Sequence, residues 1–179
     1  MDKLRSVGPA IDVYKIIDSL KPSNSNYAGT VQAAYSAYNM LSSAEKQYVT
    51  NFAELQEAKN NVDSVQAVIS KIAGISPTSR NYTEQVAEAL AMYNPLPSAV
   101  RKLVTNYDVL KSSQKEADTV DKVRQLIAEI NPNASNFKAK VTSARSAYDK
   151  LTTQQKRLVS NYFLLEDYES ELNKSTLFF

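Results

Sequence analysis

One pattern of residues occurs three times along this chain, at a constant spacing of 55 residues and without a gap. The copies include "AYNMLSSAEKQYVTNF" from Ala37, "MYNPLPSAVRKLVTNY" from Met92 and "AYDKLTTQQKRLVSNY" from Ala147. Nine of the 36 positions from Pro22 to Glu57 are identical in all copies, and in the first copy they are Pro22, Asn26, Val31, Ala34, Tyr38, Leu41, Val49, Asn51 and Leu55. A fixed period of this kind is typical of one supersecondary unit stacked on the next. We therefore expect three similar modules, residues 1–61, 62–116 and 117–173, and a C-terminal tail, residues 174–179.

The first part of each copy has the spacing of an amphipathic helix. From Tyr27 to Leu41 the apolar residues follow one another at steps of 4, 3, 4 and 3, which places them on one helical face. The recurring aromatic residues on this stripe are expected in the core rather than in a sugar-binding platform. An Asn comes directly before the stripe in every copy, at Asn26, Asn81 and Asn136. We expect its side chain to cap free backbone N–H groups at the start of the helix.

A tight hairpin follows this helix. Ser42 with Glu45, and Thr152 with Gln155, have the spacing of a capping box, in which two side chains satisfy two backbone N–H groups reciprocally. The second copy has Pro97 in place of the capping hydroxyl. Its Pro95 is expected to end the preceding helix near Tyr93 or Asn94, because proline clashes with helical backbone.

The last helix of each copy is expected to begin at the hairpin and to continue into the next copy. No Gly or Pro interrupts residues 43–73 or 98–131. A helix of about 30 residues would span roughly 45 Å. The pairs Asn60–Asn61 and Ser112–Ser113 are weak helix formers at the joints, so a local bend there stays open.

These features predict an all-α protein. We expect three tandem three-helix bundles of spectrin-like topology that share long helices and form an elongated rod. The number of helices should be eight or nine, depending on whether the joints break.

The composition excludes several kinds of chemistry. The chain has no Cys, no His and only three Gly, so it lacks thiolate and imidazole ligands, the commonest general base and a glycine-rich phosphate loop. We therefore expect no enzyme activity, no cofactor and no metal site. The net charge of +2 without a basic block argues against nucleic acid, and no apolar run reaches the roughly 20 residues that cross a bilayer. An isolated fragment is expected to be a monomer.

Two sets of polar residues recur and are the candidate binding residues. The first is Asn51, Asn106 and Asn161, each expected at the edge of the apolar stripe. Each amide either contacts a ligand or bonds to the backbone of a nearby interhelical loop and so holds its module in register. The second is Lys46, Arg101 and Lys156, which form one basic position per module and suit an anionic polymer. Their expected place in the first turn of a helix, where the dipole favours acids, points mildly to a role in binding.

The pattern "AY..L...QK..V.NY..L", as found from Ala147 to Leu165, resembles a helical repeat of cell-surface and secreted proteins of Gram-positive bacteria. Such repeats accompany surface-layer, adhesin or glycan-degrading modules. The resemblance covers all three copies, from about Val7 to Leu172, although the second copy lacks the Gln-Lys pair. It implies a location in the cell wall outside the cell. The start of the chain lacks the apolar core of a signal peptide, so the chain would then be a fragment of a longer protein.

Two hypotheses of function follow from the sequence. The first is a non-catalytic spacer or attachment segment of a bacterial cell-surface protein. The second is a binding module for an anionic cell-wall polymer, a host protein or a neighbouring envelope subunit.

Overall fold

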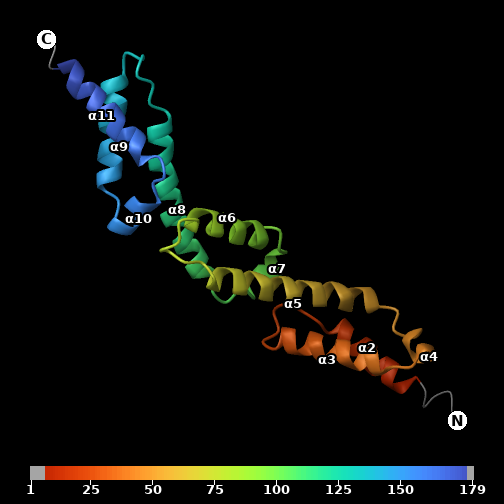
Figure 1. Cartoon of the computed structure of the whole chain (residues 1–179). Helices are drawn as coiled ribbons and strands as arrows, with labels where there is room; N and C mark the ends of the chain where they lie inside the picture. The colour runs from red at the N-terminus through yellow and green to blue at the C-terminus, as the bar shows by residue number, and fades with distance from the viewer. Residues whose placement is uncertain (1–6, 177–179) are drawn as a thin grey trace. The chain divides into compact units, whose positions relative to one another are not determined.

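The computed structural model describes residues 7–176, and within that range it is all-α (Figure 1). It has ten helices and no strand there, which confirms the predicted fold class. The helices are α2 (Gly8–Asp18), α3 (Tyr27–Met40), α4 (Ser43–Lys46), α5 (Phe52–Ala73), α6 (Tyr82–Tyr93), α7 (Ser98–Arg101), α8 (Tyr107–Ala128), α9 (Phe137–Asp149), α10 (Thr153–Leu158) and α11 (Tyr162–Thr176).

Two long helices cross the boundaries between the sequence repeats. The boundary at residues 61–62 lies inside α5 and the boundary at residues 116–117 lies inside α8. Each of these helices has 22 residues, or roughly 33 Å of length. The Asn60–Asn61 and Ser112–Ser113 pairs do not interrupt them, so the prediction of unbroken helices through the joints is confirmed.

The long helices begin later than we expected, because each hairpin contains a separate short helix. The helix α4 ends at Lys46, and α5 begins only at Phe52. Between them, Val49 and Asn51 are both buried. In an α-helix, the side chains of two residues that are two positions apart point to different sides. In extended backbone, the same two side chains point to one side. The chain therefore leaves the helix for a few residues. The prediction of eight or nine helices was wrong, because the described residues form ten, three of which are the short hairpin helices α4, α7 and α10.

The capping predictions have a mixed outcome. Both capping boxes are present, at Ser42 with Glu45 and at Thr152 with Gln155. Pro97 makes no side-chain cap, and α6 ends at Tyr93 as predicted. However, Asn26 and Asn136 precede α3 and α9 without making a side-chain cap. Their backbone lies outside the extended region that a capping residue normally adopts, with φ −115° and ψ 32° at Asn26.

The chain divides into two compact units. Unit 1 contains the residues up to Ala73 together with Ala91–Asn106, and unit 2 contains Gly74–Leu90 together with the residues from Tyr107 onward. The division passes through α6 and the middle repeat, so it does not follow the predicted repeat boundaries. The predicted tail is also partly helical, because α11 continues to Thr176, and residues 177–179 lie outside the described range.

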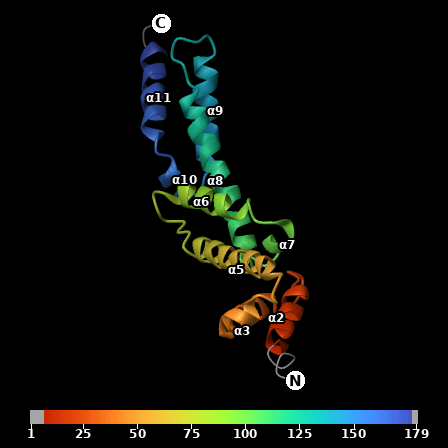
Figure 2. The same cartoon turned by 90° about the vertical axis from the view of Figure 1, so that its right-hand side faces the viewer.

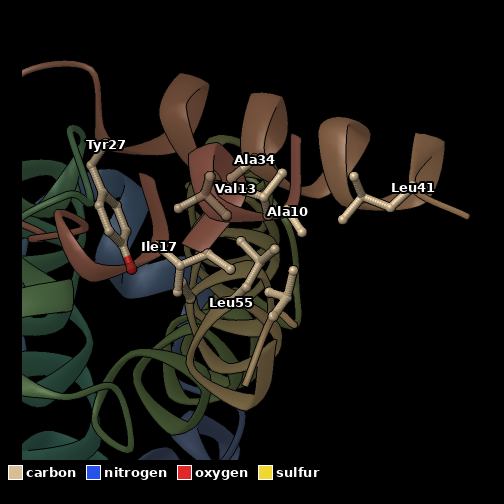
Figure 3. Close-up of a cluster of buried hydrophobic side chains, with 10 residues drawn as sticks. Ala10, Val13, Ile17, Tyr27, Ala34, Leu41 and Leu55 are labelled. Atoms are coloured by element: carbon tan, nitrogen blue, oxygen red, sulfur yellow. The ribbon is translucent and has the colours of Figure 1, made fainter. Parts of the chain in front are cut away.

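In unit 1, α2, α3 and α5 pack against one another around an apolar cluster. Figure 3 shows this cluster, with side chains from all three helices directed toward a common centre. Ala10, Val31, Ala34 and Leu55 have no exposed surface. The small residues let the helices approach closely, and Leu55 fills the space between them.

In unit 2, α8, α9 and α11 pack side by side (Figure 2). Leu165 and Ala144 have no exposed surface there, as for their equivalents Leu55 and Ala34. Arg145 of α9 forms a two-pronged ion pair with Glu169 of α11, and its guanidinium also lies 5.4 Å from the centroid of the Tyr162 ring. The bond to Glu169 raises the pKa of Arg145 further above its usual range, so this link between two helices stays charged.

Candidate functional site

The three recurring Asn side chains make the same contact in every repeat. The Nδ2 atom of Asn51 donates to the main-chain oxygen of Tyr14 at 3.1 Å. Asn106 donates to Ile69 at 3.0 Å and Asn161 donates to Arg124 at 2.9 Å, and each acceptor lies 37 residues earlier in the chain. The acceptors lie in helices α2, α5 and α8, not in the interhelical loop that we expected. Each amide therefore connects the segment before the last helix of its repeat to the first helix of the same repeat.

The opposite side of each amide is polar and enclosed. The Oδ1 atoms of Asn51, Asn106 and Asn161 are all buried, and none has a hydrogen-bond partner in the described part of the chain. The residue as a whole is 9% exposed at position 51 and half-buried at the other two. A ligand outside the protein has little access to such an amide, so its geometry favours the structural role.

Removing one of these amides should destabilise the protein moderately. We expect Asn161→Ala to lower the free energy of unfolding by about 1 kcal/mol, because one partly buried hydrogen bond is lost. Asn161→Asp should cost more, since it sets a carboxylate against the Arg124 carbonyl and buries charge. Urea denaturation measures both, and the exposed Asn94→Ala is the control, with an effect within about 0.5 kcal/mol. Unchanged stability together with weaker binding to an envelope component would instead identify the amide as a ligand contact.

The recurring cations each lie over an aromatic ring. The Nζ atom of Lys46 is 5.2 Å from the centroid of Tyr38, and that of Lys156 is 5.3 Å from Tyr148. The guanidinium of Arg101 is 5.8 Å from Tyr93. The Tyr38 ring in turn stacks on Phe52 at 3.8 Å, and Tyr148 stacks on Tyr162 at 4.2 Å.

This geometry gives each cation a partner within its own repeat. A cation over a ring is attracted by its negative face, by about 0.5–1 kcal/mol at an exposed site. Lys46 and Arg101 are the last residues of four-residue helices, which form a single turn, and Lys156 lies in the last turn of α10. All three side chains are half-buried, and the structure does not bring them together with the three Asn amides into one site.

A surface groove recurs in every repeat at equivalent positions. It lies between the first and second helices of the repeat and has a volume of about 420 Å³ in the first, 370 Å³ in the second and 570 Å³ in the third. Six lining positions are common to all three grooves. They are Pro9, Asp12, Val13, Ala37, Met40 and Leu41 in the first repeat and the residues 55 and 110 positions later in the others.

The chemistry of the groove differs between the repeats. Position 12 is Asp, and its equivalents are Ala67 and Lys122. Position 40 is Met, and its equivalents are Pro95 and Lys150. The groove of the third repeat is therefore lined by two ammonium groups and by the hydroxyls of Thr119, Thr142, Ser143 and Ser146, with no carboxylate in its lining. Sequence comparison of the copies missed positions 12 and 40, because it selected residues that are identical in every copy, and these two positions differ.

Unit 2 also contains a polar junction between the second and third repeats. Arg124 of α8 donates from Nε to the Leu158 main-chain oxygen at 3.0 Å and from Nη1 to the Thr83 hydroxyl at 3.0 Å. Beside it, the Tyr82 hydroxyl donates to Glu116 at 3.0 Å, and burial raises the pKa of that hydroxyl. A pocket of about 400 Å³ lies between Tyr82, Glu116 and the α10 hairpin.

The described residues contain no group of three His, Cys, Asp or Glu side chains that could hold a metal ion. Within residues 7–176, no helix combines the length and the apolarity needed to cross a membrane.

Comparisons with protein-family models, with curated proteins and with solved structures each return no match.

Proposed function

We propose that this chain is a non-catalytic spacer or attachment segment of a bacterial cell-surface protein, built as three tandem three-helix bundles in a stiff rod. The observation that carries the proposal is the continuity of α5 and α8 across both repeat boundaries. Bending such a helix breaks backbone hydrogen bonds and exposes the residues that it buries next to the joint, which are Val65 in α5 and Val120 in α8. Stiffness of this kind holds a distal domain away from a surface.

The recurring contacts support the same proposal. The Asn Nδ2 groups donate to main-chain oxygens and the three cations contact aromatic rings, and all of these partners lie inside the same repeat. The location in a Gram-positive cell wall rests on the resemblance of the repeat pattern described above.

Small-angle scattering tests the rod directly. We expect a maximum dimension of roughly 100–140 Å, from the helical rise and the stacking of three bundles. A compact globule of this length would have a radius of gyration near 16 Å, and a rod should have about twice that value. The scattering should be measured at low protein concentration. A radius near that of a globule would contradict the rod, and the binding module would then be the better proposal.

The second candidate function is recognition of an anionic polymer, and the groove of the third repeat favours it. Lys122 and Lys150 place two positive charges beside four hydroxyl groups there. Polyphosphate is a suitable probe, with uncharged dextran as the control ligand. The double variant Lys122→Ala and Lys150→Ala should lose binding, whereas Lys111→Ala with Lys115→Ala, exposed outside the groove, should keep most of it. Equal losses in both variants would indicate only general charge attraction.

A further inference from the structure

The third repeat contacts the second repeat through one face, here named the receiving face, and this contact lies in unit 2. In the third repeat, the receiving residues are Arg124 and Leu158. The second repeat supplies Thr83, whose hydroxyl accepts a hydrogen bond from Arg124, and Tyr82, which lines the pocket against Leu158. Both sides are well covered as a result, with Leu158 6% exposed and Tyr82 1% exposed.

Unit 1 shows the same arrangement at the equivalent position of the second repeat. Leu103, which corresponds to Leu158, is half-buried and packs against the apolar cluster of the first repeat. Tyr27, which corresponds to Tyr82, belongs to that cluster and is 4% exposed. Leu103 in the second repeat and Leu158 in the third are thus both apolar and at least half-buried.

In the first repeat, the residues at the equivalent positions are exposed within the described part of the chain. Tyr48, which corresponds to Leu103 and Leu158, is 58% exposed. Tyr14 corresponds to Arg124 and is 39% exposed, and Ile11 lies one helical turn before Tyr14 and is 44% exposed. These three residues, here named the open face, are three of the seven large hydrophobic residues that are exposed in the described part of the chain. Clustered apolar exposure of this kind marks interaction surfaces.

The third repeat has the matching donor residues, and in the described part of the chain they are more exposed than their equivalents. Phe137, which corresponds to Tyr27 and Tyr82, is half-buried and contacts the Tyr168 ring edge-on at 6.0 Å, whereas Lys138, which corresponds to Thr83, is exposed. By the geometry of unit 2, a residue at position 138 faces one at position 14. Lys138 against the ring of Tyr14 is a favourable cation–ring pair, just as Thr83 suits Arg124.

We propose that the open face of the first repeat binds the Phe137–Lys138 end of the third repeat in a second copy of this chain. The two surfaces differ, so the contact is head-to-tail and extends into a filament unless the rotation closes a ring. The contact area is that of one bundle end, so the association is weak and the chain is monomeric when dilute.

Directed cross-linking tests this contact, because the chain has no native Cys. Tyr48→Cys and Lys138→Cys are prepared separately, mixed and oxidised. We expect the mixed disulfide dimer to form several times faster than either homodimer. Met40→Cys is the matched control, since Met40 is 86% exposed but lies outside the open face, and with Lys138→Cys it should give only background.

Sedimentation velocity supplies an independent readout. The unmodified chain should show a rising average mass toward millimolar concentration, and Tyr48→Ser should reduce this rise while Met40→Ser leaves it unchanged. Tyr48 is exposed, so neither variant should affect folding, which circular dichroism checks. Equal cross-linking of the Tyr48→Cys and Met40→Cys variants, preferential Tyr48 homodimers, or a monomer at every concentration would each overturn the proposal. A rod that stays monomeric would leave the spacer function intact, so the two proposals fail separately.

Discussion

Lys115→Pro is expected to lower the free energy of unfolding by about 3 kcal/mol or more. Lys115 is exposed in the middle of α8, next to the boundary between the second and third repeats, so its side chain contributes little to packing. Proline there removes the backbone hydrogen bond to residue 111 and its ring clashes with that carbonyl group. The loss therefore measures the continuity of the helix through the joint.

The matched variants make this result specific. Lys115→Ala keeps the helix and should change the free energy of unfolding by less than about 0.5 kcal/mol. Asn60→Pro makes the equivalent change in α5, one repeat earlier, and should have a similar cost. Urea denaturation followed by circular dichroism gives the energies. If both proline variants were as stable as the alanine variant, the helices would not be continuous at the joints in solution.

Leu110→Ala is expected to lower the free energy of unfolding by about 2–5 kcal/mol. Leu110 lies in α8 with no exposed surface, and its equivalents Leu55 and Leu165 are buried to the same extent. Truncation removes apolar surface from the core and leaves a cavity that a close-packed interior fills only in part.

The neighbouring residue supplies the control for this prediction. Val109 belongs to the same turn of α8 but is 52% exposed, so Val109→Ala should cost little. The shape of the unfolding curve also matters. Because α8 crosses the joint between two repeats, Leu110→Ala should shift a single cooperative transition. A separate early transition for one repeat would show that the repeats unfold independently.

The three repeats combine a constant frame with a variable surface. The buried Leu, the Asn contact to the first helix and the cation over a ring recur in each repeat. The groove changes from Asp12 and Met40 in the first repeat to Lys122 and Lys150 in the third. Changes at these exposed positions leave the core as it is, so one frame supports different surface chemistry.

The sequence by itself determined the helical class, the repeat and the absence of Gly and Pro from the joints between repeats. These follow from local physics, because apolar spacing, capping residues and the absence of Gly and Pro act within a few turns of one helix. The capping box of Ser42 and the stop before Pro95 are of this kind. The passage of α5 through Asn60–Asn61 is different, because the weak propensity of Asn left a bend open and the burial of the flanking Ala58 and Val65 in the folded structure favours the unbroken helix.

The tertiary structure alone decided where the Asn amides bond, why the hairpin helices are separate and which faces remain open. Asn51 reaches a carbonyl group 37 residues away, a distance at which sequence spacing gives no direction. The break before α5 lets Val49 and Asn51 both be buried, and Asn51 bonds there to the neighbouring helix α2. Tyr48 and Leu158 occupy equivalent positions, yet one is exposed and the other is buried. The difference comes from the preceding repeat, whose packing is a long-range contact that no local pattern encodes.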